Sequence, residues 1–321
     1  MPCHILKTGQ NRCYDHKGME IPCPSTGQDG EIQFGRAWPR PRFKVRNGVV
    51  TDRLTGLVWL KDAKRGGFPV TWNEALEEIR RLNQFNWQGI RDWRLPNRRE
   101  LRSLLSHRHS KPALPSDHKF IKVFPGWYWT STSAALNPAY AWYGHTEGGR
   151  MFYGHKSQYC LVWPVSGQGN GVLPRTGQKN CYNQEGKIIK GNNTGQDGDL
   201  RLGAKWPETR FELRGEVVRD NLTGLAWSQN ADLARGSVDW QASLDLVKGL
   251  SFPAPAGYTP WRLPNINELE SLVDASRHSP ALPAGHLFIE TRESYWSSTT
   301  SAFETDWAMA LYLHKGAVGV G

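Results

Sequence analysis

Apolar side chains along this chain alternate with polar ones in many short stretches and recur at helical spacing in only a few. Alternation over 43–45 and 49–50 precedes the Thr55-Gly56 pair and a further apolar run over 57–59. A two-residue period is typical of strands that bury one face, and a Thr-Gly pair between such runs favours a tight turn. We therefore expect antiparallel strands joined by a turn in this part of the chain.

Helical spacing is clearest over 72–82. Leu76, Ile79 and Leu82 lie on one face of a helix with this span, and charged residues occupy the opposite face. Thr71, followed by a glutamate three residues later, is the sequence signature of a capping box. The pattern predicts an amphipathic helix that begins directly after Thr71.

A second, shorter helix is predicted over 98–105, where Asn97 is the N-cap and Leu101 points inward. A proline-rich loop at 112–115 leads into a Tyr-Trp strand that continues into hydroxyl residues, over 128–133. Further strands are expected over 141–143, 151–153 and 159–165.

Nearly all of this pattern occurs twice, and the second copy lies 168 residues after the first, as Trp59 and Trp227 illustrate. A period of this length indicates a duplicated domain, because solenoid repeats are about 20–50 residues long. We expect an α+β protein with two tandem domains, 1–167 and 168–321. Each would hold two short helices, several short antiparallel strands and long loops. The second copy ends before the counterpart of 159–165, so its domain is expected to lack a final strand.

The composition changes this picture mainly through charge. The net charge is +10, but residues 1–168 hold 25 Lys and Arg against 13 Asp and Glu, whereas residues 169–321 hold 15 against 17. If the fold required this positive charge, both copies would have it. The excess of Lys and Arg in the first copy therefore points to a polyanionic partner. No stretch approaches the length of a membrane span, and the N-terminus has no apolar signal-peptide core.

The five cysteines can be interpreted through the repeat. Cys3 and Cys23 both correspond to glycines in the second copy, so we expect a Cys3–Cys23 disulfide that was gained or lost as a unit. Cys13 has a counterpart in Cys181, whereas Cys160 lies in the segment that the second copy lacks. We therefore expect Cys13–Cys160, with the partner of Cys181 beyond the end of the second copy. The alternative is five reduced thiols in a cytosolic protein.

Three ordered motifs, each present in both copies, resemble the DUF1566 family, also called the Lcl C-terminal domain. In the first copy they are Val-Thr-Asp-Arg-Leu-Thr-Gly-Leu-Val-Trp (50–59), Trp-Arg-Leu-Pro-Asn (93–97) and Tyr-Trp-Thr-Ser (128–131). The resemblance implies a bacterial secreted or cell-surface protein. It also implies a fold related to C-type lectins and formylglycine-generating enzymes, and binding of sulfated glycans as in an adhesin of the family. It supplies no catalytic residues and no cofactor.

Several motifs are better explained by the fold than by chemistry. The Trp-Arg-Leu-Pro-Asn motif is identical in both copies, so its Asn is expected to cap a helix and its Trp to anchor the core. The hydroxyl run after Tyr128 lacks the surroundings of a nucleophilic serine. His107, His109 and His118 suggest a metal, but only His118 has a histidine counterpart, so no metal site is expected. Asp29 lies in an Asp-Gly turn that needs no calcium ion.

The basic residues that distinguish the first copy form our candidate polyanion-binding surface. They are Arg98, Arg99, Arg102, His107, Arg108, His109 and Lys111 on and after the second helix, together with Arg36, Arg40, Arg42, Lys44 and Arg46 near the first strands. Guanidinium groups match the geometry of sulfate and phosphate. The alternative is a solvated basic face that only aids solubility.

We therefore expect a non-enzymatic, secreted or cell-surface binding protein whose first domain recognises an acidic or sulfated polysaccharide rather than nucleic acid. The alternative is a protein partner in a surface assembly. In that case the chain is a structural subunit or decoration of an extracellular filament, associated through strand donation or a covalent link at Cys181. A third hypothesis, an enzyme related to formylglycine-generating enzymes, needs a reactive cysteine pair, and no pair is shared by the two copies.

Overall fold

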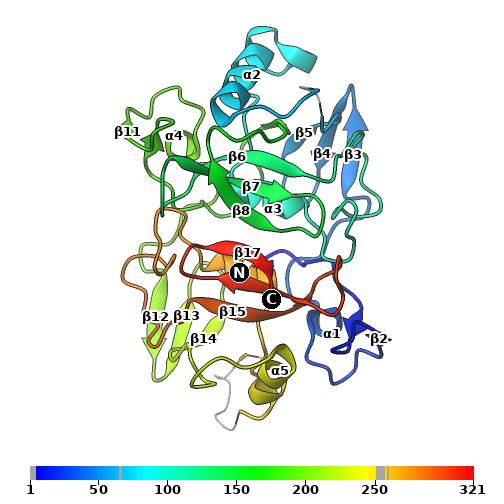
Figure 1. Ribbon diagram of the computed structural model, residues 1–321, viewed down its shortest axis with the longest axis vertical. Helices are drawn as coiled ribbons and strands as arrows, with labels where there is room; N and C mark the ends of the chain where they lie inside the picture. The colour runs from blue at the N-terminus through cyan, green and yellow to red at the C-terminus, as the bar shows by residue number, and fades with distance from the viewer. Residues whose placement is uncertain (1–4, 65–66, 251–256, 259) are drawn as a thin grey trace.

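The computed structural model describes residues 5–64, 67–250, 257–258 and 260–321, and it confirms the α+β class. Two halves are stacked along the long axis, with α2 (Trp72–Gln84) at one end and α5 (Trp240–Lys248) at the other (Figure 1). The expected C-type-lectin-like arrangement stays a prediction.

The first half contains most of the elements that the apolar pattern predicts. They are β3 (Phe43–Arg46), β4 (Val49–Asp52), β5 (Val58–Leu60), α2, α3 (Arg98–Leu104), β6 (Trp127–Ser133), β7 (Tyr140–His145) and β8 (Met151–His155). The 3-10 helix η1 (Trp87–Gly89) was not predicted, and the expected strand over 159–165 is wrong, because only β9 (Val165–Ser166) is a strand there and Cys160 and Leu161 form isolated bridges. Both helices start where expected, because the side chains of Thr71 and Asn97 each accept a hydrogen bond from the third helical amide in a complete capping box.

The described residues of the second half repeat this order without counterparts of η1 and β9. It contains β12 (Phe211–Arg214), β13 (Val217–Asp220), β14 (Ala226–Ser228), α5, α6 (Ile266–Ser271), β15 (Ser294–Thr300), β16 (Ala308–Tyr312) and β17 (Ala317–Val320). The small sheet of the first half has the order β3-β4-β5-β9, whereas that of the second half is β12-β13-β14.

The halves are joined through a shared six-stranded sheet of order β15-β16-β17-β8-β7-β6. Its centre is the antiparallel pair β17 and β8, in which Val318 lies opposite Met151. These two residues are counterparts in the repeat, because the second copy is one residue shorter before its Tyr-Trp strand. Two counterparts that face each other place a local twofold axis between them. One buried apolar cluster crosses this axis and includes Leu101 and Leu269.

The N-terminal segment of each copy packs against the opposite half. The first segment contains β1 (Cys13–Tyr14), β2 (Glu20–Ile21) and α1 (Asp29–Ile32), and the second contains β10 (Cys181–Tyr182), β11 (Ile188–Ile189) and α4 (Asp197–Leu200). Figure 1 shows α1 beside the half that contains β15, and α4 beside the half that contains β6. The boundary at 167/168 therefore divides the two repeats in the sequence, but each half of the folded molecule contains residues from both sides of it.

A buried aspartate anchors each exchanged segment. Thr299 of the second half donates a hydrogen bond to Asp29 at 2.8 Å, and Thr132 of the first half donates one to Asp197 at 2.7 Å. Burial raises the pKa of both carboxyl groups to about 6, although hydrogen bonds from threonine hydroxyls oppose the change.

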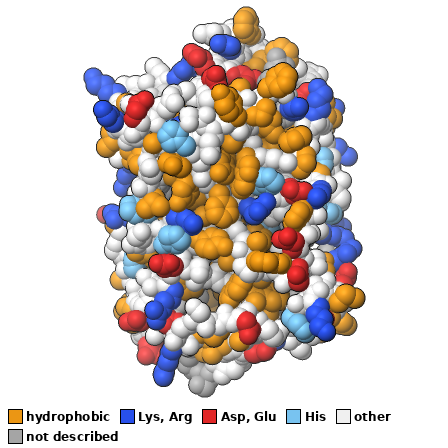
Figure 2. All heavy atoms as spheres, viewed as in Figure 1, with side chains coloured by type: hydrophobic (Ala, Val, Ile, Leu, Met, Phe, Trp, Pro, Cys, Tyr) orange, Lys and Arg blue, Asp and Glu red, His pale blue; other side chains and the backbone are white. Residues whose placement is uncertain are grey.

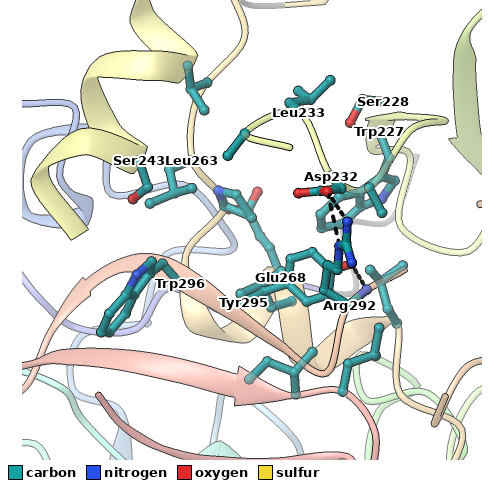
Figure 3. Close-up of a pocket in the computed structure, with 18 of the residues that line it drawn as sticks. Trp227, Ser228, Asp232, Leu233, Ser243, Leu263, Glu268, Arg292, Tyr295 and Trp296 are labelled. Carbon is teal, nitrogen blue, oxygen red and sulfur yellow. Dashed lines mark hydrogen bonds and ion pairs between the residues drawn. The ribbon is translucent and has the colours of Figure 1, made fainter. Parts of the chain in front are cut away.

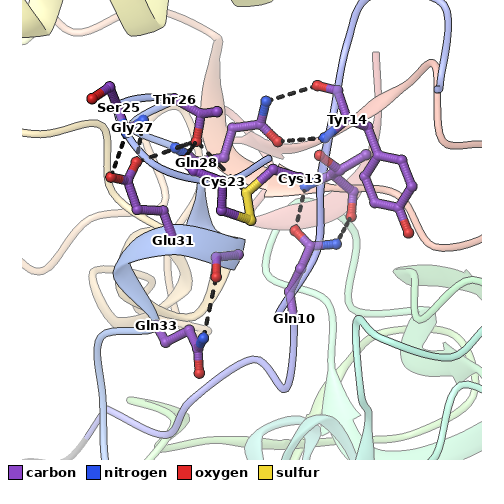
Figure 4. The surroundings of a disulfide bond; sticks show 12 residues. Gln10, Cys13, Tyr14, Cys23, Ser25, Thr26, Gly27, Gln28, Glu31 and Gln33 are labelled. Atoms are coloured by element: carbon purple, nitrogen blue, oxygen red, sulfur yellow. Dashed lines mark hydrogen bonds between the residues drawn. A yellow bond between two sulfur atoms is a disulfide. The ribbon is translucent and has the colours of Figure 1, made fainter. Parts of the chain in front are cut away.

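The cysteine pairing differs from both expectations. Cys13 is bonded to Cys23, with Cα atoms 5.2 Å apart, and Cys160 is a buried free thiol (Figure 4). The expected Cys13–Cys160 bond is therefore wrong, and so is Cys3–Cys23, since Cys23 is already paired; Cys3 lies outside the described residues. The reason is local: the β1–β2 hairpin pairs Cys13 with Ile21, which brings Cys23 next to it.

The free thiol of Cys181 is also explained by the local hairpin, β10–β11. It is buried, and the position that corresponds to Cys23 is Gly191. A Cβ atom placed on Gly191 would lie 3.7 Å from the Cys181 sulfur. Cys181 therefore has the hairpin position of Cys13, and the place of its local partner is occupied by glycine.

Candidate functional site

The helical arginines of the candidate surface lie inside the molecule. Arg98 is 2 % exposed and Arg102 is 6 % exposed, and both bind the carboxylate of Glu270 on α6, at 3.0 Å and 2.7 Å. Arg99 is half-buried and donates to the carbonyl oxygens of Ser271 and Val273. The expectation that this face of α3 meets solvent is wrong, because α3 packs against its counterpart α6.

The charge difference at this contact follows from its position on the twofold axis. Arg102 and Glu270 are counterparts in the repeat and face each other directly. In an arrangement of identical copies, a charged residue at such a position would meet its own like charge. The Arg102–Glu270 pair replaces that repulsion by a buried ion pair. Part of the charge asymmetry between the copies therefore serves the interface.

The loop after α3 is only partly exposed. His107 is buried, and desolvation together with the nearby Arg102 lowers its pKa to about 3, so it is neutral under ordinary conditions. Arg108 is exposed and His109 is half-buried. Lys111 is exposed and forms an ion pair with Glu147 at 2.8 Å. Among the described residues, no group of three His, Cys, Asp or Glu side chains is placed to hold a metal ion.

The other basic cluster divides into one structural residue and four surface residues. Arg42 is 1 % exposed and binds Asp52 through two hydrogen bonds of 3.0 Å and 2.8 Å. The second copy has the same buried pair, formed by Arg210 and Asp220. Arg42 therefore belongs to the fold. The exposed residues are Arg36, Arg40, Lys44 and Arg46.

Lys44 and Arg46 lie on β3, which is the edge strand of its sheet, and alternate residues of a strand share a face. Within the described parts of the chain, neither these two side chains nor those of Arg36 and Arg40 form an ion pair. On the matching strand, Glu212 replaces Lys44 and pairs with Arg214 at 3.2 Å. Figure 2 shows Lys and Arg side chains along the edge of the molecule where Figure 1 places β3.

The Trp-Arg-Leu-Pro-Asn motif has the structural role that its repetition predicts. Arg94 binds both oxygens of Glu100, at 2.6 Å and 2.7 Å, and Trp93 is 2 % exposed. Arg262 and Glu268 form the equivalent pair in the second half. The motif joins the chain before each short helix to the helix itself.

A large cavity lies in the second half, and the sequence interpretation did not foresee it. Its volume is about 930 Å³, and Trp227, Tyr295 and Trp296 are among the aromatic residues that line it (Figure 3). Asp232 and Arg292 form an ion pair of 2.6 Å at its wall. The sequence did contain a signal: the residues that surround the cavity, Trp227, Phe288 and Tyr295 among them, correspond to the aromatic residues around Trp163 in the first copy.

Comparison with known proteins identifies the family. The model of the Lcl C-terminal domain matches residues 48–166 and 216–321, and a search of curated proteins finds no match. The match excludes the exchanged N-terminal segments, so the resemblance covers less of each copy than the sequence motifs suggested. No helix in the described part of the chain is both long and apolar enough to cross a bilayer. With most of its length matched in two segments, the chain belongs to the Lcl C-terminal domain family and carries two tandem copies of that domain.

Proposed function

We propose that this chain is a non-enzymatic binding protein, located at the cell surface or outside the cell, that recognises acidic or sulfated polysaccharide. The proposed contact surface consists of Arg36, Arg40, Lys44 and Arg46, which we call the β3 basic surface. The observation that carries the proposal is the difference between two matching edge strands. The first presents exposed cations without ion pairs among the described residues, and the second presents a paired glutamate and arginine.

The geometry of an edge strand suits a linear polyanion. Residues two apart on a strand are separated by roughly 6.5–7 Å, so Lys44 and Arg46 offer two cations in a row on one face. Arginine binds sulfate or carboxylate through two parallel hydrogen bonds, and lysine acts as a point charge. Because these groups are exposed, binding should weaken as ionic strength rises.

Binding to immobilised heparin tests the proposal. The double variant Lys44→Ala, Arg46→Ala should bind about ten-fold more weakly, which corresponds to roughly 0.7 kcal/mol for each cation. The matched control carries Glu212→Ala and Arg214→Ala at the equivalent positions of β12 and should bind as the wild type does. Glu212→Lys should strengthen binding, because it recreates the basic edge in the second half.

Two outcomes would contradict the proposal. Equal loss of heparin binding in both double variants would show that the position on the strand is unimportant. Equal retention on duplex DNA and on heparin at the same salt concentration would indicate attraction to any polyanion. Neutral dextran serves as the control for adsorption to the matrix.

A further inference from the structure

The cavity of the second half occupies the place that a polypeptide strand fills in the first half. In the first half, residues 159–166 return from β8 across the sheets and end in β9, and their central side chain is Trp163. Among the described residues of the second half, no segment takes this course. We call residues 159–166 the closing segment.

The surroundings of Trp163 show that the closing segment and the cavity occupy equivalent places in the two halves. Its ring contacts Trp59, Phe120 and Tyr128, with ring centroids 5.8, 4.7 and 5.4 Å away. The counterparts of these three residues are Trp227, Phe288 and Tyr295. All three line the cavity. Among the described residues, the second half therefore has the aromatic pocket without a tryptophan that fills it.

The backbone partners of the closing segment are repeated as well. Leu161 exchanges hydrogen bonds with Trp127 and Trp129, and Val165 exchanges two with Arg94, all between 2.8 and 3.0 Å. The corresponding positions in the second half, Ser294, Trp296 and Arg262, all line the cavity. The cavity thus combines an aromatic pocket with main-chain positions arranged to pair with an extended strand.

Exposure of the lining agrees with an unfilled strand position. Trp59, Tyr128 and Trp129 are each 0 % exposed in the first half. Their counterparts in the second half, Trp227 among them, are only half-buried. Contiguous apolar surface of this kind, rimmed by polar groups, typically marks an interaction site on a soluble protein.

We propose that the cavity binds an extended apolar polypeptide strand, with a tryptophan that enters the pocket formed by Trp227, Phe288 and Tyr295. The occupant is a strand because the equivalent site of the same molecule holds one, with the same aromatic walls. This is strand addition, in which main-chain hydrogen bonds provide affinity and side-chain pockets provide specificity. The inference is independent of the β3 basic surface.

A peptide with the sequence of residues 157–167 and serine in place of Cys160 is the probe. Labelled with a fluorophore, it should bind the full chain saturably at a ratio of one to one, measured by fluorescence anisotropy. The peptide with Trp163→Ala should bind at least ten-fold more weakly, because a buried tryptophan is a typical hot spot.

Variants of the protein locate the site. Trp227→Ala should weaken binding at least ten-fold, and Ser228→Leu, which introduces the residue found at position 60, should strengthen it. Trp307→Ala is the matched control, because Trp307 is 45 % exposed and lies outside the cavity lining. If Trp227→Ala does not fold, the peptide variant and Ser228→Leu still test the site.

Three results would overturn the inference. They are the absence of saturable binding, equal affinity for the peptides with and without Trp163, and an apolar dye that binds in the cavity without being displaced by the peptide. The last result would identify a small-molecule pocket, whose usual volume of about 300–1,000 Å³ includes that of this cavity.

Discussion

Replacement of Glu270 by glutamine should destabilise the molecule as a whole. Glu270 is 6 % exposed, and its carboxylate binds Arg98 and Arg102 across the interface between the halves. Glutamine has nearly the same shape but no charge, so it leaves two buried guanidinium groups without their anion. The variant therefore removes the negative charge that neutralises the two buried arginines, and it changes the packing little.

The magnitude follows from two independent arguments. Removal of one partner of a buried ion pair typically costs about 3–5 kcal/mol, because the other charge stays buried. Separately, the Glu270 pKa is lowered from 4.5 to about 2 by Arg102 and Arg98, which outweigh the desolvation that would raise it. That difference corresponds to roughly 3 kcal/mol of preference for the ionised form in the folded state.

The sign of the pH dependence provides a second check. The folded state binds the Glu270 proton more weakly than the unfolded state, so this stabilisation is present above about pH 4.5 and is lost as the pH falls toward 2. The difference in unfolding free energy between the wild type and Glu270→Gln should therefore be full at pH 7 and close almost completely near pH 2.

Urea unfolding followed by tryptophan fluorescence measures the effect. Glu147→Gln is the control, because Glu147 pairs with Lys111, whose side chain is 62 % exposed, and such pairs contribute about 0–1 kcal/mol. We expect a loss of about 3 kcal/mol for Glu270→Gln and less than 1 kcal/mol for the control. Equal losses in the two variants, or a difference that does not depend on pH, would refute the reasoning.

Three further predictions concern other parts of the structure. Gly191→Cys should form a disulfide with Cys181, detected by mass spectrometry as two fewer alkylatable thiols than in the same variant after reduction, and should add roughly 2–3 kcal/mol of stability. Asp29 and Asp197 have folded-state pKa values raised to about 6, so their stabilisation is present below pH 4 and is lost as the pH rises through 6. The double Asn variant should therefore gain several kcal/mol relative to the wild type between pH 4 and 8, and a constant difference would contradict this. Asn97→Ala should cost about 1 kcal/mol in urea unfolding, because it removes a helix cap, and no loss would argue against that role.

The local elements were predictable because their determinants are close in sequence. Thr71 and Asn97 act on amides three residues away, and Leu76 and Ile79 take positions set by the helical period. Comparison of the two copies also showed which residues serve the fold. A motif identical in two copies of different charge is constrained by the fold, and the Arg94–Glu100 pair confirms this for the Trp-Arg-Leu-Pro-Asn motif.

The candidate site was less predictable, and α3 illustrates the reason. A helix with leucines on one face and arginines on the other is expected to expose the arginines. Arg98 and Arg102 are instead buried, because Glu270, which lies 172 and 168 residues further along the chain, compensates their charge. Lys44 and Arg46 are exposed as expected, since an edge strand with charged side chains has solvent on one side.

The sequence by itself determined the α+β class, the two repeats and the capped helices. It did so through local hydrogen bonds, periodicity and comparison of one copy with the other. Only the tertiary structure decided that the N-terminal segments exchange between the halves, that Cys13 pairs with Cys23, and that the second half contains an open aromatic cavity. These features depend on contacts between residues brought together by packing, and the pattern of neighbouring residues carries little information about such contacts.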